Sequence, residues 1–153
     1  MKHKIFFILL FINLFGYSQI IYDSCIESIY DTIKINFEYN GFKDELNGIV
    51  MIKRDSILYA MSMKSFGGRE ILGYRDLTDT GSVILINPDL SDSLLLTWTI
   101  YHEIGHHIGL KHDTSRFNMM QPELFYPTDD EMSLLVFEFF MLLKYRKFVN
   151  SKD

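Results

Sequence analysis

Apolar and polar side chains alternate between residues 32 and 39, where Ile33, Ile35, Phe37 and Tyr39 are separated by polar residues. A period of two is typical of a strand with one buried face. Short apolar runs bounded by Gly, Asn, Asp or Ser recur further along the chain and predict more strands. We therefore expect about five strands, at residues 32–39, 49–53, 57–63, 70–77 and 83–86.

The spacing of apolar residues changes to three and four after Asn87-Pro88. Apolar residues at 94, 95, 98 and 101 share one face of a helix, for which residues 91–93 offer N-caps. A second helix begins at Thr128, because Glu131 completes the spacing of a capping box and apolar residues follow at helical spacing. Glu138 interrupts that apolar run, so we expect the helix to pack on the sheet and not to insert into a membrane. Strands followed by helices indicate an α+β domain.

The first 18 residues have the features of a secretory signal peptide. Lys2 and Lys4 both precede an apolar run over residues 5–12, and Gly16 and Ser18 are small residues ahead of a cleavage point. We therefore expect a secreted protein whose mature chain begins at Gln19. Residues 19–31 show no clear period, and we assign them to an N-terminal segment that precedes a domain at residues 32–153.

Composition limits the class of protein and its partners. A chain of 153 residues with 48% apolar and 23% charged residues fits one folded domain. The net charge is −5 and basic residues cluster only near the termini, which argues against nucleic acid or an anionic membrane as a partner. Cys25 is the single cysteine, so an intrachain disulfide is excluded. We expect a monomer.

The chemistry-bearing residues lie together in the sequence H-E-x-x-H-x-x-G-x-x-H. On a helix, His102 and His106 lie one turn apart on the same face, while Glu103 projects beside them. Gly109 accepts the left-handed conformation that ends a helix, and His112 can then turn back towards the other two histidines. Three neutral imidazoles with one open coordination position are the ligands of a catalytic zinc, so we expect one zinc ion.

This motif resembles that of the metzincin metallopeptidases, and of the matrixins among them. The residues 118–122, Asn-Met-Met-Gln-Pro, are similar to the matrixin Met-turn, with Met120 eight residues after His112. The resemblance implies a small metzincin-like domain, in which a mixed sheet packs on the active-site helix and the C-terminal helix. It also implies zinc-dependent hydrolysis of internal peptide bonds, with Glu103 as general base and acid and with a protein or peptide substrate.

Two departures from the matrixins follow from the sequence. Matrixins have a long helix between their first two strands, whereas only residues 42–46 offer a helical turn here. Their second, structural zinc needs further histidines, and every histidine beyond the expected signal peptide lies in the motif, including a structural His107. Calcium stays open, and its weak candidates Asp76, Asp79 and Asp89 are better suited to turns.

The N-terminal segment offers a latency device. Residues 19–23 resemble the short propeptide start of karilysin-type bacterial matrixins, in which an aspartate binds the zinc. Asp23 is therefore a candidate latency ligand. The alternative is that Asp23 belongs to a loop or to the start of a strand and has no contact with the zinc. Cys25 lacks the sequence context of a matrixin cysteine switch. An extended substrate would pair with residues 70–74, and the pocket for the residue after the cleaved bond would lie beside residues 121–127.

Two other functions are weighed against an endopeptidase. In a gluzincin the third ligand would be a downstream carboxylate such as Glu123 or Glu131. The capping box already accounts for Glu131, and the continuation of the motif to His112 argues against this reading. A catalytically inactive metzincin-like domain would act as a zinc-containing binding module. The intact Glu103 favours a secreted zinc metalloendopeptidase over that module.

Overall fold

The computed structural model describes residues 20–21, 23–65, 71–114, 118–122 and 126–151. These residues form an α+β domain with one mixed sheet of four strands in the order β1-β2-β4-β3. The strands are β1 (Ile20–Ile21), β2 (Ile49–Arg54), β3 (Gly73–Thr78) and β4 (Gly81–Ile86). β2 runs parallel to β1 and β4, whereas β3 is antiparallel to β4 and forms one edge of the sheet. The expected α+β class and mixed sheet are confirmed, and the expected count of five strands is wrong for the described part of the chain.

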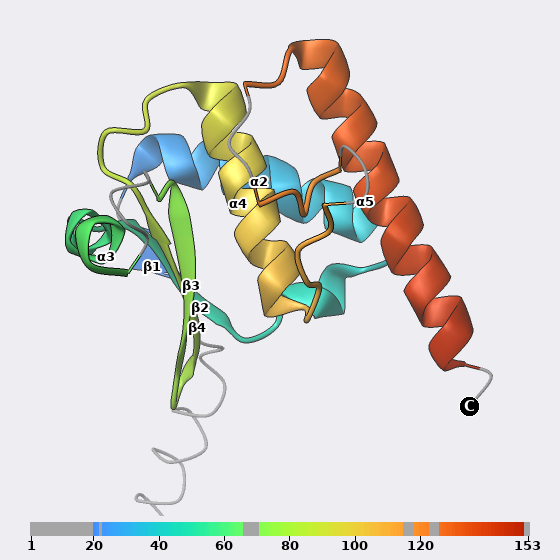
Figure 1. The fold of residues 1–153 in the computed structure, drawn as a ribbon. Coiled ribbons are helices and arrows are strands. Elements are labelled where there is room, and N and C mark those ends of the chain that lie inside the picture. Colours follow the sequence, from blue (N-terminus) through green and yellow to red (C-terminus); the bar gives the residue numbers. More distant parts are fainter. Residues whose placement is uncertain (1–19, 22, 66–70, 115–117, 123–125, 152–153) are drawn as a thin grey trace, which may run out of the picture.

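Four α-helices and one 3-10 helix complete the domain. They are α2 (Ser24–Tyr39), η1 (Lys43–Leu46), α3 (Ile57–Ser65), α4 (Ser93–His107) and α5 (Asp129–Asn150). Figure 1 shows α4 between the sheet and the long C-terminal α5, with α2 crossing behind it. The expected packing of the C-terminal helix on the sheet is therefore wrong, because the apolar face of α5 packs on α4 and α2. None of the described helices has the length and apolar composition needed to cross a membrane.

The strand expected at residues 32–39 is wrong, because these residues are the second half of α2. The helix begins where the Asp23 carboxylate accepts hydrogen bonds from the backbone N–H groups of Cys25 (2.8 Å) and Ile26 (3.3 Å). Its buried positions are 26, 30, 33 and 37, which follow a helical period. Ile35 is 66% exposed, although the two-residue alternation placed it on the buried face. α2 also lies between β1 and β2, so the expected lack of a long helix there is wrong.

The strand expected at residues 57–63 is wrong as well. Asp55 accepts a hydrogen bond from the backbone N–H of Ile57 (3.0 Å) and starts α3. Leu58 is 1% exposed while Ile57 on the preceding position is 51% exposed. A short continuous apolar run has no period that separates a strand from a helix, so the sequence pattern alone does not decide between them. Residues 54–56 therefore lead from β2 into a helix and not into a hairpin.

The remaining elements agree with the sequence in type. The strand predictions at residues 49–53, 70–77 and 83–86 correspond to β2, β3 and β4. Asp92 is the N-cap of α4, with its side chain accepting from the N–H of Leu95 (2.8 Å). Thr128 and Glu131 form the expected capping box of α5.

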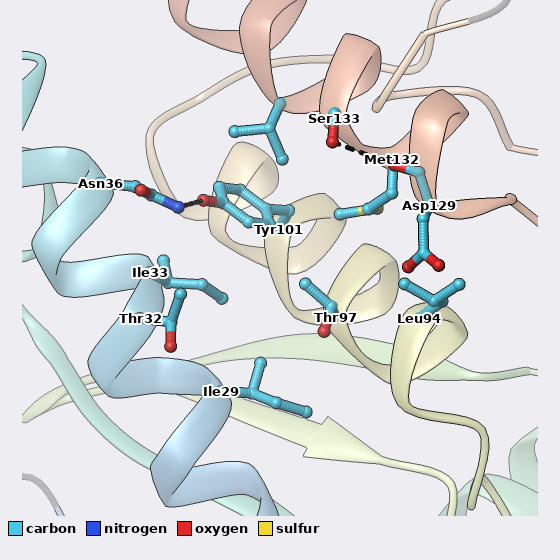
Figure 2. Close-up of a pocket in the computed structure, with 11 residues that line it drawn as sticks. Ile29, Thr32, Ile33, Asn36, Leu94, Thr97, Tyr101, Asp129, Met132 and Ser133 are labelled. Carbon is cyan, nitrogen blue, oxygen red and sulfur yellow. Dashed lines mark hydrogen bonds between the residues drawn. The ribbon is translucent and has the colours of Figure 1, made fainter.

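An aromatic cluster joins α2, α4 and α5. Tyr101 of α4 lies against Phe37 of α2 (ring centroids 6.3 Å apart) and Phe139 of α5 (5.6 Å). Figure 2 shows the hydroxyl of Tyr101 accepting a hydrogen bond from the Asn36 side-chain amide (2.9 Å) in the groove between these helices. Stacked and edge-on rings add directional contacts to apolar burial, so this cluster fixes the helix that carries the histidines.

The N-terminal boundaries have different outcomes. The expected signal peptide, residues 1–18, lies outside the described residues. The boundary expected between residues 31 and 32 falls within α2, and Ile26 and Tyr30 from the proposed N-terminal segment are fully buried in the common core. Residues 24–31 are therefore packed as part of the domain.

Candidate metal centre

The three histidines come together because α4 ends in a left-handed turn. Gly109 has φ +82°, a conformation that glycine adopts without strain. The N–H of Leu110 donates to the carbonyl of Gly105 (2.8 Å) and that of Gly109 to the carbonyl of His106 (3.1 Å), the two bonds of a Schellman motif. The chain therefore reverses directly after α4, as the sequence predicts, and returns His112 to the face that carries the other two rings.

The Nε2 atoms of His102, His106 and His112 form a small triangle. The distances are 3.1 Å between His102 and His106, 3.2 Å between His102 and His112, and 3.0 Å between His106 and His112. His102 is buried, His106 is half-buried and His112 is exposed, so the triangle opens to solvent on the side of His112. Among the described residues, these side chains are the one group of three or more that could hold a metal ion.

The hydrogen bonds of two ligands leave lone pairs directed at the centre of this triangle. The Nδ1 atom of His102 lies 2.9 Å from the carbonyl of Met119, and Nδ1 of His106 lies 3.1 Å from that of Leu110. Because a carbonyl oxygen only accepts, both Nδ1 atoms carry the hydrogen of a neutral ring. Their Nε2 atoms then face each other at 3.1 Å without a hydrogen between them, an arrangement that a bound cation stabilises.

Burial keeps the deepest ring neutral. Burial lowers the pKa of His102 to about 4, although the hydrogen bond to the Met119 carbonyl acts to raise it. Burial also lowers the pKa of His106. Neutral imidazole is the form that binds metals, so both ligands on α4 are in the binding form at neutral pH.

Glu103 lies beside the histidines but outside the group of ligand atoms. Its side chain is buried, with 6% of the residue exposed. Burial raises the pKa of Glu103 to about 8, while a hydrogen bond from the backbone N–H of Arg75 and the charge of Arg75 act to lower it. A carboxyl group with a pKa near neutrality can both accept and release a proton, which is the requirement for general acid–base chemistry.

The edge strand β3 approaches Glu103 at a glycine. A Cβ atom on Gly73 would lie 2.6 Å from Thr99 Cγ2 and 3.0 Å from Glu103 Cγ. No larger residue fits there without displacing α4 or the Glu103 side chain. The close contact places the buried carboxylate next to the edge of the sheet.

Met120 lies against the helix that carries the histidines. The carboxamide of Asn118 accepts a hydrogen bond from the N–H of Met120 (2.7 Å), and the N–H of Gln121 donates to the carbonyl of Asn118 (3.2 Å), so residues 118–121 form a tight turn. Met120 is 1% exposed and its thioether sulfur occupies the space that a Cβ on Gly105 would need. The preceding residue of the turn, Met119, binds the His102 ring, so one turn both packs under α4 and orients a ligand.

Asp23 is not brought to the histidines. One carboxylate oxygen caps α2, and the other lies 2.6 Å from Nε of Arg54. Arg54 also donates to the carbonyls of Asn87, Pro88 and Leu90, which connects the start of α2 to the loop before α4. The Arg54 hydrogen bond lowers the pKa of Asp23 and keeps it charged in this structural role. Its role as a latency ligand stays a prediction.

The other sequence candidates lie away from the triangle. His107 has the expected structural role, since its ring bonds Ser82 Oγ (2.8 Å) and the carbonyl of Asn47 (3.0 Å). Glu131 closes the capping box of α5, where its Oε2 accepts from the N–H of Thr128 (2.8 Å). The alternative ligand Glu123 lies outside the described residues. Asp76, Asp79 and Asp89 form no group with other potential ligands among the described residues.

Three residues near the site were not singled out from the sequence. Gly73 and Gly105 allow the close approaches of β3 and Met120, and Arg75 adds a backbone donor and a positive charge beside Glu103. A glycine inside a helical pattern is a signal of close approach, because it is less favourable there than alanine by about 1 kcal/mol. Nothing in the local pattern distinguishes Arg75 from any polar residue of an edge strand.

Comparison with known proteins gives no match to a family model, to a curated protein or to a solved structure. The functional argument therefore rests on the sequence motif and on the geometry of the residues around it.

Proposed function

We propose that the protein is a secreted zinc-dependent endopeptidase of the matrixin-like metzincin type. The observation that carries the proposal is the triangle of Nε2 atoms from His102, His106 and His112, 3.0–3.2 Å apart, with the buried Glu103 beside it and outside the ligand group. A structural metal site has no need of a buried carboxyl that does not bind the metal. A hydrolytic site needs one to move protons.

The donor set fits zinc. Zn–N bonds of about 2.0–2.1 Å in tetrahedral geometry set the ligand nitrogens roughly 3.3–3.4 Å apart. The triangle is slightly tighter, and a small outward movement of the exposed His112 would complete it. Three neutral imidazoles and an open side towards solvent match a catalytic site, whereas structural zinc sites are closed by four protein ligands.

The chain's own residues account for the proton transfers of peptide hydrolysis. A zinc ion held by the three imidazoles supplies Lewis acidity, which polarises a carbonyl and makes water more acidic. Glu103 takes the proton of the attacking water and then donates it to the nitrogen of the departing amine. The Arg75 backbone N–H donates to the Glu103 carboxylate and orients it at the edge of β3. The carbonyls of Met119 and Leu110 hold the His102 and His106 rings in the tautomer that leaves Nε2 unprotonated.

The edge of β3 provides a path for the substrate. One side of β3 pairs with β4, and its other side faces no described strand. An extended peptide can add to such an edge through main-chain hydrogen bonds, and Gly73 brings that edge against Glu103. Within the expected substrate-binding segment, Gly73 and Tyr74 belong to this strand and residue 70 lies outside the described residues. Of the expected apolar pocket, the described Tyr126 is 70% exposed.

Two features of the fold support the resemblance to matrixins. The long helix α2 lies between β1 and β2, where matrixins have a helix and where the sequence alone offered too little room. The turn at residues 118–121 packs Met120 under α4, as a Met-turn would. The edge strand β3 runs antiparallel to β4, while the other pairs in the sheet are parallel.

Zinc content and cleavage of casein together test the proposal. The wild-type protein should bind one zinc per chain and cleave casein, and a chelator should abolish cleavage. Glu103→Gln should retain zinc and lose cleavage by at least about a hundredfold, because only the proton carrier is removed. Glu131→Gln is the matched control and should keep both properties. A Glu103→Gln variant that cleaves casein like the wild type would refute the assignment.

The same measurements separate the two alternatives. Loss of zinc in His112→Ala supports the three-histidine site, whereas retention of zinc in His112→Ala and its loss in Glu123→Ala would identify a gluzincin. A wild-type protein that binds zinc and leaves both casein and a peptide library intact would be the inactive binding module.

A further inference from the structure

The outer face of α5 carries a continuous stripe of exposed apolar side chains. Leu134 is 53% exposed, Phe137 62%, Met141 49%, Tyr145 68% and Phe148 57%. Their spacing of three, four, four and three residues keeps them on one face of the helix. The face buried in the domain core is the opposite one, formed by Met132, Leu135, Phe139, Phe140 and Leu143.

No described helix or strand covers this stripe. Figure 1 shows α5 along one side of the molecule, with α4 on its inner side and none of the labelled elements beyond it. Three aromatic residues half or more exposed on one helix face are unusual for the surface of a monomer, on which single scattered apolar residues are normal. A contiguous apolar stripe of this kind indicates an interaction surface.

The spacing of the stripe is symmetric about Met141. If two copies of α5 lie antiparallel with Met141 on a twofold axis, Phe137 meets Tyr145 of the second copy and Leu134 meets Phe148 of the second copy. Each apolar residue then faces an apolar residue, which is the condition for a self-complementary, isologous interface. The stripe from Leu134 to Phe148 extends the contact over about 21 Å.

The charges of α5 favour the antiparallel arrangement over the parallel one. Asp129, Asp130 and Glu131 occupy its first turn, whereas Lys144 and Lys147 lie near its end, and all are exposed. Antiparallel pairing opposes the two helix dipoles and brings the acidic first turn of each helix to the C-terminal end of the other, about one turn beyond Lys147. Parallel pairing would bring like charges together at both ends.

We propose that the protein forms a twofold homodimer in which the α5 helices pair antiparallel through this stripe, in place of the monomer expected from the sequence. Covering the five exposed side chains on both copies would bury roughly 1,100 Å², since an aromatic side chain offers about 150–250 Å². That is at the lower limit for a specific interface and predicts a dimer that dissociates on dilution. The stripe faces away from α4, so the histidines stay accessible in both copies.

Sedimentation velocity over a dilution series tests the dimer in the purified protein. The wild type should have twice the mass of one chain at high concentration and dissociate on dilution. Met141→Lys places two like charges on the twofold axis and should weaken self-association by at least about tenfold. Leu77→Lys is the matched control, because Leu77 is 70% exposed on β3 and lies outside the stripe, and it should dimerise like the wild type. A monomer at all concentrations, or a dimer unaffected by Met141→Lys, would overturn the proposal.

Cross-linking tests the direction of pairing without relying on the stability of one variant. In a Cys25→Ser background, a mixture of Leu134→Cys and Phe148→Cys chains should give mixed dimers with a short thiol cross-linker. Leu134→Cys alone should give none, because residues 134 lie at opposite ends of an antiparallel pair. Dimers from Leu134→Cys alone would show parallel pairing, and a monomeric wild type that binds anionic vesicles would assign the stripe to a lipid surface. Both results would contradict the proposed dimer.

Discussion

The substitution Gly105→Ala tests whether Met120 packs against α4, the helix that carries His102 and His106, as described. A Cβ atom at residue 105 would overlap Met120 Sδ and lie 3.1 Å from its Cε and 3.4 Å from Phe139 Cε2. Met120 is 1% exposed and its backbone is held by Asn118, so neither the side chain nor the turn can move away freely. The added methyl group must therefore displace the Met120 side chain or the turn that carries it.

The expected change in the free energy of unfolding is the difference between two opposing effects. Overpacking in a well-packed core destabilises by about 1–3 kcal/mol. Replacing glycine by alanine inside a helix stabilises by about 1 kcal/mol. Gly105→Ala should therefore lower the free energy of unfolding by about 0–2 kcal/mol, which corresponds to at most roughly 8 °C in Tm for a chain of this size. Displacement of the Met119 carbonyl from the His102 ring should also weaken zinc binding by about tenfold.

A double-mutant cycle with Met120→Ala isolates the contact between the two residues. Met120→Ala alone should destabilise by about 2–5 kcal/mol through the cavity that it leaves. In the double variant the methyl group added at residue 105 occupies part of that cavity. The double variant should therefore be more stable than the sum of the single effects predicts, by about 1–3 kcal/mol.

Denaturant unfolding of the chelated protein provides the free energies, and zinc competition with a coloured chelator provides the affinities. The control cycle pairs Gly105→Ala with Met132→Ala, which truncates another buried methionine away from Gly105 and should give additive effects. If Gly105→Ala and Met120→Ala are also additive, or if Gly105→Ala is more stable than the wild type, then the turn does not pack on α4 as described.

Three further predictions concern the N-terminal cap, pH and the metal. Asp23→Ala should destabilise the protein by about 1–2 kcal/mol in thermal unfolding, whereas Asp23→Asn keeps the helix cap and should destabilise it less. Unchanged activity on casein in both variants would exclude latency through Asp23. Because burial raises the pKa of Glu103 from 4.5 to about 8, the folded metal-free protein holds a proton that the unfolded chain releases, so stability should fall by about 2 kcal/mol between pH 6.5 and 8. The lowered pKa of His102 affects stability at lower pH, because its contribution to stability is fully present above pH 6.5 and is lost as the pH falls towards 4. A Glu103→Gln variant that loses the same stability between pH 6.5 and 8 would contradict the reasoning. Zinc at a thousand times its Kd should raise the free energy of unfolding by about 4 kcal/mol in the wild type and by much less in His112→Ala. Equal stabilisation of both proteins would exclude His112 as a ligand.

The clustering of His102, His106 and His112 was largely predictable because its determinants are local. The i, i+4 spacing of His102 and His106, the left-handed Gly109 and the capping box of Thr128 and Glu131 act over a few residues and leave direct marks in the sequence. The tight turn at Met120 was expected from a short motif in the same way.

The errors arose where tertiary packing chose between two patterns. In α2 the apolar residues satisfy a period of two from residue 33 onward, and only the earlier positions 26 and 30 reveal the helical period. In α3 the apolar run has no period at all. Gly73 contacts Thr99 and Glu103 of α4, and Gly105 contacts Met120. These partners lie well outside the local sequence of each glycine, so the local pattern does not identify them.

If the three histidines bind zinc as proposed, their unequal burial has a kinetic consequence. His102 and His106 are held on one helix by hydrogen bonds to backbone carbonyls and form a preorganised bidentate half-site. His112 lies on the exposed turn that follows, so an ion entering from solvent meets it at the mouth of the site. Metal exchange should therefore proceed stepwise, with His112 released first and the two α4 ligands last. Its rate would then be set by the movement of one short turn and not by opening of the domain.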